Sequence, residues 1–148
     1  MITDQIRKTL EAGLEGEAKA HLLYTFYARV ADEEAGFAPT PEIAELLRRS
    51  AELFRQIAQE EVAHAYAHLT AMDGIGDTRQ NIATALEAET YEYKMMYPSS
   101  ALAARADGNE TIAAKFEAIS LAERRHATEF EQLHERLTEA WLKNRLGD

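Results

Sequence analysis

Two short motifs of one form, Glu-x-x-His, constrain this sequence more than any other feature. They are Glu61…His64 and Glu123…His126, and each lies in a long stretch whose apolar residues recur with the period of an α-helix. Residues three apart on a helix share one face, about 60° apart in rotation. Each motif therefore presents a carboxylate and an imidazole side by side, and the fold must position two such helix faces.

Capping residues place the first motif on the second helix of a hairpin. Thr3 can cap a first helix that ends near Gly36. Thr40, followed by Pro41 at the first helical position, is expected to begin a second helix that stops at residues 73–77. The first predicted hairpin spans about residues 3–72.

The second motif lies at the corresponding place in a second hairpin, at about residues 78–142. Its first helix should begin near Thr78 and reach Tyr97, where Pro98 should kink or break it, and a further helical stretch should reach Ala106. After a turn at residues 107–109, a last helix should run to about Leu142. Four long helices with short turns predict a single all-α domain over residues 1–148, a four-helix bundle. The residues expected to form its core include Leu22, Phe26, Ile57, Phe116 and Trp141.

Composition narrows the chemistry. The 148 residues contain no cysteine, so zinc–cysteine, iron–sulfur and thiolate sites are excluded, and a metal must bind to oxygen and imidazole nitrogen. A formal charge of −10 argues against a nucleic-acid partner, because phosphate binding needs clustered Lys and Arg. The sequence shows neither an apolar run that would span a bilayer nor an N-terminal export signal, so a cytoplasmic protein without a membrane partner is expected.

The motifs predict a site for two metal ions. Di-iron carboxylate bundles combine Glu-x-x-His on two helices with a glutamate from each of the other two. Glu17 on the first helix, and Glu89 or Glu92 on the third, can supply those glutamates. Mixed carboxylate and imidazole ligands suit iron or manganese. The alternative, that these are ordinary surface glutamates, requires four helices to match by accident.

At this point the sequence resembles the rubrerythrin family of ferritin-like proteins over nearly its whole length. The resemblance rests on Gly16-Glu17…Tyr24, Glu60-Glu61-Val62-Ala63-His64-Ala65, Ala88-Glu89-Thr90-Tyr91-Glu92…Met96-Tyr97-Pro98 and Ala122-Glu123-Arg124-Arg125-His126-Ala127. It implies a ferritin-like bundle that holds two iron ions. These ions would cycle between Fe²⁺ and Fe³⁺, and manganese or zinc could replace them. The implied metal ligands are Glu17, Glu61, His64, Glu89, Glu92, Glu123 and His126.

The resemblance also implies roles beyond metal ligation. Glu92 and His64 would be the pair that one iron exchanges as its redox state changes. Tyr24 and Tyr97 would lie beside the ligands, with aromatic core packing as the alternative for both. On an ideal helix Tyr97 lies about 140° from Glu92, so it reaches the site only if the helix is distorted near Pro98. His21, His68 and His134 are expected to be structural or solvent-facing.

The implied function is a non-haem di-iron peroxidase that reduces hydrogen peroxide to water. Full-length rubrerythrins carry a further iron on four cysteines, which these residues lack, so a separate electron donor is expected, such as a rubredoxin-like protein or a reductase. The alternatives are a ferroxidase that handles or stores iron and a metal-free helical scaffold. The scaffold ranks last, because inward-facing glutamates without metal repel one another.

The connection at residues 73–77 predicts the assembly. In a ferritin-like bundle the second and third helices run parallel, so the chain between them must return along the bundle. Five extended residues span only about 20 Å, whereas the return is about 28 Å. A domain-swapped homodimer removes this conflict, because each site then takes Glu17, Glu61 and His64 from one chain and its other ligands from the partner.

Overall fold

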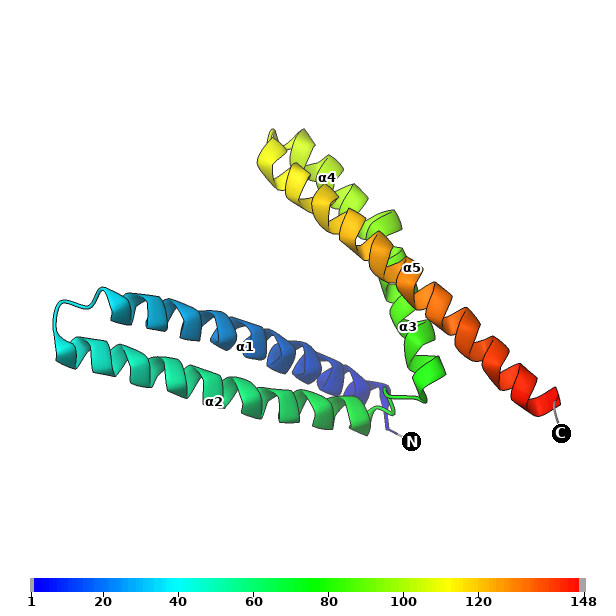
Figure 1. The fold of residues 1–148 in the computed structure, drawn as a ribbon, viewed down its shortest axis with the longest axis horizontal. Helices are drawn as coiled ribbons and strands as arrows, with labels where there is room; N and C mark the ends of the chain where they lie inside the picture. The colour runs from blue at the N-terminus through cyan, green and yellow to red at the C-terminus, as the bar shows by residue number, and fades with distance from the viewer. Residues whose placement is uncertain (1, 147–148) are drawn as a thin grey trace. The chain divides into compact units, whose positions relative to one another are not determined.

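The computed structural model describes residues 2–146, and these residues form helices joined by short turns and no strand (Figure 1). The helical elements are α1 (Asp4–Gly36), α2 (Pro41–Ala71), α3 (Thr78–Tyr91), a π-helical turn η1 (Glu92–Met96), α4 (Tyr97–Ala106) and α5 (Glu110–Leu146). They divide into two compact units, Met1–Ile75 and Gly76–Asp148. The all-α class is confirmed.

The first unit is a hairpin in which α1 and α2 lie side by side (Figure 1). Its predicted caps are confirmed: the Thr3 hydroxyl accepts a hydrogen bond from the backbone N–H of Ile6, and the Thr40 hydroxyl accepts one from that of Ile43. Pro41 follows in the first turn of α2, where its missing N–H needs no partner.

The second unit packs α5 against α3, η1 and α4 (Figure 1). Asp77 begins α3 with a capping box, because its side chain accepts from the Gln80 N–H while the Gln80 side chain accepts from the Asp77 N–H. The prediction of a kink or break at Pro98 needs refinement. The helix widens into the π turn before Pro98 and continues through α4.

Buried alanines form the contact between the helices of the first hairpin. Ala28, Ala31 and Ala51 are at most 6% exposed, and Phe54 packs against them. Small side chains let two helix backbones approach closely. Leu22, Phe26 and Trp141, which were predicted to belong to the core of the bundle, are each more than half exposed on their own hairpins.

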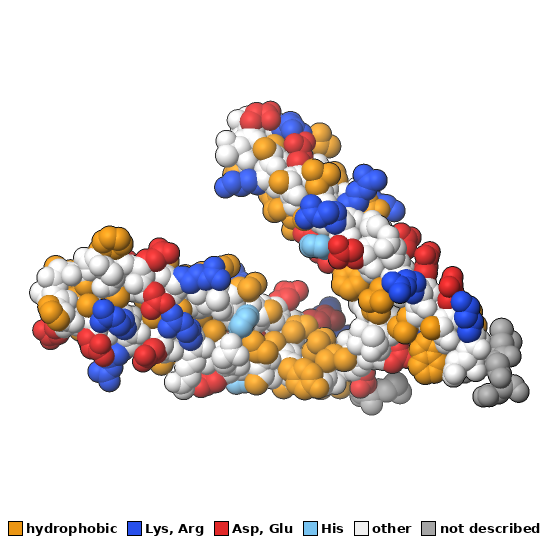
Figure 2. Space-filling view, in the orientation of Figure 1, with side chains coloured by type: hydrophobic (Ala, Val, Ile, Leu, Met, Phe, Trp, Pro, Cys, Tyr) orange, Lys and Arg blue, Asp and Glu red, His pale blue; other side chains and the backbone are white. Residues whose placement is uncertain are grey.

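Large apolar side chains remain exposed on both units, and Figure 2 shows them over the surface of each hairpin. They include Leu46 and Leu53 on α2 and Ile119 and Leu133 on α5. A hairpin alone is too thin to bury a core, so such faces need a cover of other helices. The apolar residues are also interrupted by charges, and no helix among the described residues is long and apolar enough to cross a membrane.

Candidate metal centre

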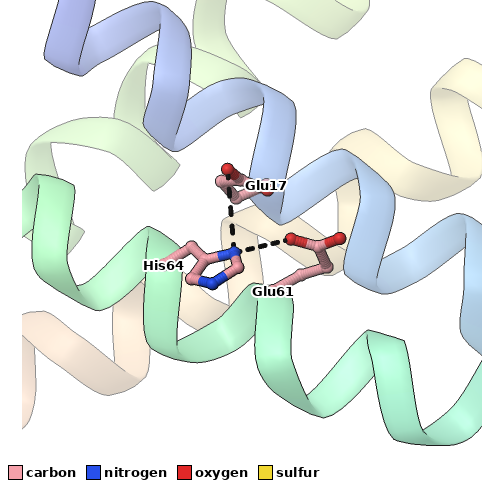
Figure 3. A group of neighbouring side chains, drawn as sticks. All are labelled: Glu17, Glu61 and His64. Carbon is pink, nitrogen blue, oxygen red and sulfur yellow. Dashed lines mark hydrogen bonds and ion pairs between the residues drawn. The ribbon is translucent and has the colours of Figure 1, made fainter.

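The first hairpin brings together three of the predicted ligands, Glu17 from α1 with Glu61 and His64 from α2. Figure 3 shows the His64 ring facing both carboxylates, with a dashed line from one ring nitrogen to each. Its Nδ1 lies 3.0 Å from Oε2 of Glu61 and 3.9 Å from Oε1 of Glu17. The carboxylates are the more buried members, with Glu61 15% and His64 59% exposed. The i, i+3 spacing on α2 thus places both side chains opposite Glu17, as the motif predicts.

The second hairpin repeats this arrangement with Glu89 from α3 and with Glu123 and His126 from α5. Nδ1 of His126 lies 2.7 Å from Oε2 of Glu123 and 3.4 Å from Oε2 of Glu89. Here too the carboxylate of the Glu-x-x-His motif is the more buried member, since Glu123 is 15% exposed and His126 is 47% exposed. In each triad, one ligand atom from every residue lies within 4.8 Å of the others. Each hairpin therefore carries its own candidate metal-binding triad.

The carboxylates of each triad are close enough to perturb each other. The hydrogen bond between Glu17 and Glu61 raises the pKa of Glu17 and lowers the pKa of Glu61, which also accepts from His64. Burial, followed by the neighbouring Glu123 carboxylate, raises the pKa of Glu89. Like charges held together in this way favour a bound proton or a bound cation.

A metal ion fits the second triad on independent grounds. Oε2 of Glu89 is buried and accepts no hydrogen bond from the described residues. A buried carboxylate oxygen without a partner is unfavourable, and a cation placed between it and the His126 ring would satisfy it. The donor set of carboxylate oxygens and imidazole nitrogen suits iron or manganese, and zinc also accepts it.

The π turn explains how Tyr97 reaches the second triad. The Tyr97 N–H donates to the carbonyl of Glu92, five residues earlier, where an α-helix would use a residue four earlier. A wider turn reduces the rotation between these two residues, which is about 140° on an ideal α-helix. Burial, followed by the charges of Glu92, Glu123 and Glu89, raises the pKa of Tyr97, so its hydroxyl lies in the field of these three carboxylates.

A contact from α5 accompanies the π turn. The Ser120 hydroxyl donates a 3.1 Å hydrogen bond to the backbone carbonyl of Tyr93, within the turn. After the turn, the hydroxyls of Ser99 and Ser100 donate to the carbonyl of Met96. These bonds satisfy carbonyls where the regular helical ladder is interrupted. Ser120 was not predicted from the sequence. The only sequence signal for this region was Pro98, which follows the π turn and indicates a distorted helix.

Three predicted site residues lie outside the triads: Tyr97, described above, Glu92 and Tyr24. Glu92 begins the π turn, and it is half-buried near Tyr97 but belongs to neither triad. Tyr24 packs its ring against Tyr27 and Phe54, with ring centroids 6.2 Å and 6.0 Å away. This is the aromatic packing that the sequence left open as an alternative. The roles of Glu92 and Tyr24 beside a metal stay predictions.

The remaining histidines of the first hairpin make structural contacts. Nδ1 of His21 lies 2.8 Å from the backbone carbonyl of Ala58, which links α1 to α2. The His68 ring lies so close to Gly13 that a Cβ at that glycine would be 2.7 Å from Nε2. This contact explains a glycine inside α1, where alanine is normally favoured by about 1 kcal/mol. For His21 the structural interpretation is confirmed.

Metal binding should depend steeply on pH. The hydrogen bond with Glu123, and then the contact with Glu89, raise the pKa of His126, so protons occupy this ring at higher pH than an ordinary imidazole. Since a metal binds only the neutral ring, affinity should fall as pH is lowered through this raised pKa, about tenfold per pH unit for each proton displaced. Titration with Mn²⁺ between about pH 6 and pH 8 measures this. An affinity independent of pH would exclude His126 as a ligand.

Comparison with known proteins places the chain in a family. Residues 8–134 match the family model Rubrerythrin. A putative rubrerythrin of Methanocaldococcus jannaschii is 31% identical over 141 residues, which cover 85% of this chain and 67% of the relative. Rubrerythrin-1 of Clostridium acetobutylicum is 28% identical over 139 residues, covering 89% and 71%. The rubrerythrin of Nitratidesulfovibrio vulgaris is 29% identical over 136 residues, covering 83% and 65%.

This chain spans about two thirds of the length of these relatives. The match over most of its residues agrees with the all-α fold and with a carboxylate–histidine triad on each hairpin. The chain therefore belongs to the rubrerythrin family of di-iron, ferritin-like proteins.

Proposed function

We propose that this chain is a di-iron peroxidase, which reduces hydrogen peroxide to water with electrons from a separate donor protein. The observation that carries the proposal is the pair of matching triads, Glu17, Glu61 and His64 on one hairpin and Glu89, Glu123 and His126 on the other. Together they offer four carboxylates and two imidazoles, the set that di-iron carboxylate bundles use. Relatives at about 30% identity carry the name rubrerythrin.

Each triad would hold one side of the metal pair, and Glu92 would add a seventh ligand. Two ferrous ions bound there would supply the two electrons that, with two protons, convert one hydrogen peroxide into two water molecules. In each triad the imidazole is the more exposed ligand, at 59% for His64 and 47% for His126. His64 and Glu92 would exchange as ligands of one iron as its redox state changes.

The protein would also manage the protons of this reaction. With its raised pKa, the Tyr97 hydroxyl stays protonated at neutral pH and can donate a hydrogen bond toward the carboxylates around it. Glu17 and Glu89 have raised pKa values and hold protons more readily than ordinary glutamates, Glu17 because it faces the Glu61 carboxylate, and Glu89 because of burial and then the Glu123 carboxylate. Groups that keep protons next to a reacting oxygen are suited to general acid catalysis.

The direct test is anaerobic stopped-flow absorbance on the iron-loaded, fully reduced protein, mixed separately with hydrogen peroxide and with dioxygen. A peroxidase should be oxidised much faster by peroxide, and about one peroxide should be consumed for each metal pair. Zinc-loaded protein is the control, because zinc has no redox chemistry and should consume neither oxidant. Oxidation by dioxygen at an equal or higher rate would overturn the proposal in favour of a ferroxidase.

A further inference from the structure

The π turn leaves one backbone carbonyl, that of Tyr93, without a regular donor from its own helix. An α-helix would give this carbonyl the N–H four residues on, which belongs to Tyr97. That N–H donates instead to the Glu92 carbonyl. A π turn would give it the N–H five residues on, but this residue is Pro98, which has no N–H. The helix therefore offers the Tyr93 carbonyl neither of these two partners.

A side chain from another helix takes the place of the missing donor. The Ser120 hydroxyl, on α5, donates to the Tyr93 carbonyl at 3.1 Å, and both residues are half-buried. A buried carbonyl without a donor is unfavourable, because it has lost its water and gained no other partner. The other Ser and Thr hydroxyls that donate within the described part of the chain all bind a carbonyl three or four residues earlier. The Ser120 bond is different, because it joins two helices.

Ser120 lies on the face of α5 that carries both the aromatic partner of Tyr97 and a member of the second triad. Phe116 lies four residues before Ser120, and its ring centroid is 6.1 Å from that of Tyr97. Glu123 lies three residues after Ser120 and belongs to the triad. Residues at these spacings share a helix face. The hydroxyl that contacts the π turn is thus within one helical turn of a candidate metal ligand.

The register of the π turn decides where Tyr97 lies. In an α-helical register the Tyr97 N–H would return to the Tyr93 carbonyl, and Tyr97 would lie about 140° from Glu92. The wider turn reduces this rotation and keeps the Tyr97 hydroxyl in the field of the three carboxylates described above. The Ser120 hydroxyl occupies the carbonyl that the α-helical register would use, so it opposes a return to that register.

We propose that Ser120 is a positioning residue of the metal centre: its hydroxyl replaces the donor that the Tyr93 carbonyl lacks and so holds Tyr97 beside the second triad. Ser120 acts on the backbone of the turn, whereas the Tyr97 hydroxyl is the group that faces the carboxylates. Resting on the proposed function, the inference also gives Ser120 an effect on peroxide turnover, through the position of Tyr97.

Two variants with side chains of nearly the same shape test the hydroxyl itself. Ser120→Thr keeps a hydroxyl, whereas Ser120→Val has a methyl group in its place. The valine variant should therefore lose the bond to the Tyr93 carbonyl, and the threonine variant should keep it. Ser100→Ala is the matched control, because the Ser100 hydroxyl lies beside the turn but donates within its own helical segment, to the Met96 carbonyl at 2.8 Å.

Two residue pairs make the turn observable by NMR. Tyr93–Lys94 is the only Tyr–Lys pair in the sequence, and Met96–Tyr97 is the only Met–Tyr pair. The full chain is loaded with zinc, which has no unpaired electrons, and is labelled with ¹³C at the carbonyls of Tyr and Met and with ¹⁵N in Lys and Tyr. Each pair then gives one cross-peak between a labelled carbonyl and the next amide. The first reports the Tyr93 carbonyl, and the second reports the Tyr97 N–H.

In Ser120→Val the Tyr93 carbonyl resonance should move upfield, as expected for a lost hydrogen bond, and the Tyr97 N–H should exchange with solvent about 10-fold faster or more. Both should stay at their wild-type values in Ser120→Thr and Ser100→Ala. Equal behaviour of the valine and threonine variants would overturn the proposal, and so would unchanged exchange of the Tyr97 N–H in Ser120→Val. If circular dichroism shows that the valine variant does not fold, Ser120→Ala removes the hydroxyl without adding volume and carries the same expectation.

Peroxide turnover of the iron-loaded protein is the second measurement. Turnover should fall about 10-fold or more in Ser120→Val, the effect expected when a group that supports a metal centre is misplaced, and should stay close to wild type in Ser120→Thr. The NMR measurement involves no peroxide, so a wild-type protein that consumes none would refute only the proposed function. An active wild-type protein whose turnover survives Ser120→Val would overturn the role of Ser120 in the reaction.

Discussion

Replacing Glu61 with alanine is expected to abolish metal binding at its triad and to reduce peroxide turnover by at least about 100-fold, while the helices stay folded. Glu61 contacts both other members of the triad, so its loss removes one ligand and releases two others. Even groups that only orient a ligand contribute about 10- to 100-fold to affinity or activity, and a ligand itself should contribute at least as much. Metal content, steady-state turnover and circular dichroism measure the three parts of this prediction.

The neighbouring residue offers a matched control. Glu60 is exposed on the same helix, and its carboxylate accepts a hydrogen bond from the Gln56 side chain. Glu60→Ala removes the same group from the same turn and should leave metal content and turnover unchanged. Equal turnover in the Glu61 and Glu60 variants would show that the triad does not hold the working metals. Loss of helix content in the Glu61 variant would instead assign this carboxylate a structural role.

The Glu92→Ala variant is expected to separate metal binding from peroxide turnover. Glu92 lies outside both triads, so Glu92→Ala should keep most of the bound metal, because six other ligands remain. Turnover should nevertheless be lost, since the proposed exchange with His64 needs this carboxylate. A Glu92→Ala variant with normal peroxide turnover would contradict that role and leave the peroxidase proposal resting on the two triads alone.

The sequence predicted those features of this protein that depend on nearby residues. Thr3 and Thr40 mark helix starts because a side-chain oxygen and a backbone N–H three residues later are enough to make a cap. The triads were also within reach of the sequence. A Glu-x-x-His motif fixes two ligands on one helix face, and each hairpin then needs only one glutamate from its other helix.

Features that depend on contacts between helices were harder to predict. Ala28 and Ala51 form the buried contact of the first hairpin, whereas Leu22 and Phe26 are exposed on it. The size of a side chain does not reveal which face of its helix a neighbouring helix covers. The π turn before Pro98 shifts the register of Tyr97, and part of its support is the Ser120 hydroxyl from another helix. A local pattern could show that the helix must be distorted there, but not in which way.

Removing the metals is expected to lower the melting temperature of the protein by about 10 °C or more. A ligand that binds only the folded state stabilises it by about 4 kcal/mol at a concentration 1,000 times its dissociation constant. For a chain of this length, 1 kcal/mol corresponds to about 2–4 °C. Without a cation, the Glu17–Glu61 and Glu89–Glu123 pairs must stay close together without compensation, as the raised pKa values of Glu17 and Glu89 indicate. Calorimetry before and after chelation measures the change.

The pH dependence of the metal-free protein tests whether the triads are the source of this loss. A group with a raised pKa in the folded state contributes its stability when protonated and loses it as pH rises through that pKa. His126, Glu17 and Glu89 all have raised pKa values, so they should make the metal-free protein more stable on mild acidification from neutral pH. The metal-loaded protein should instead lose stability, because protons displace its metals. Opposite slopes are thus expected for the two forms, and parallel slopes would mean that the triads do not hold the stabilising ions.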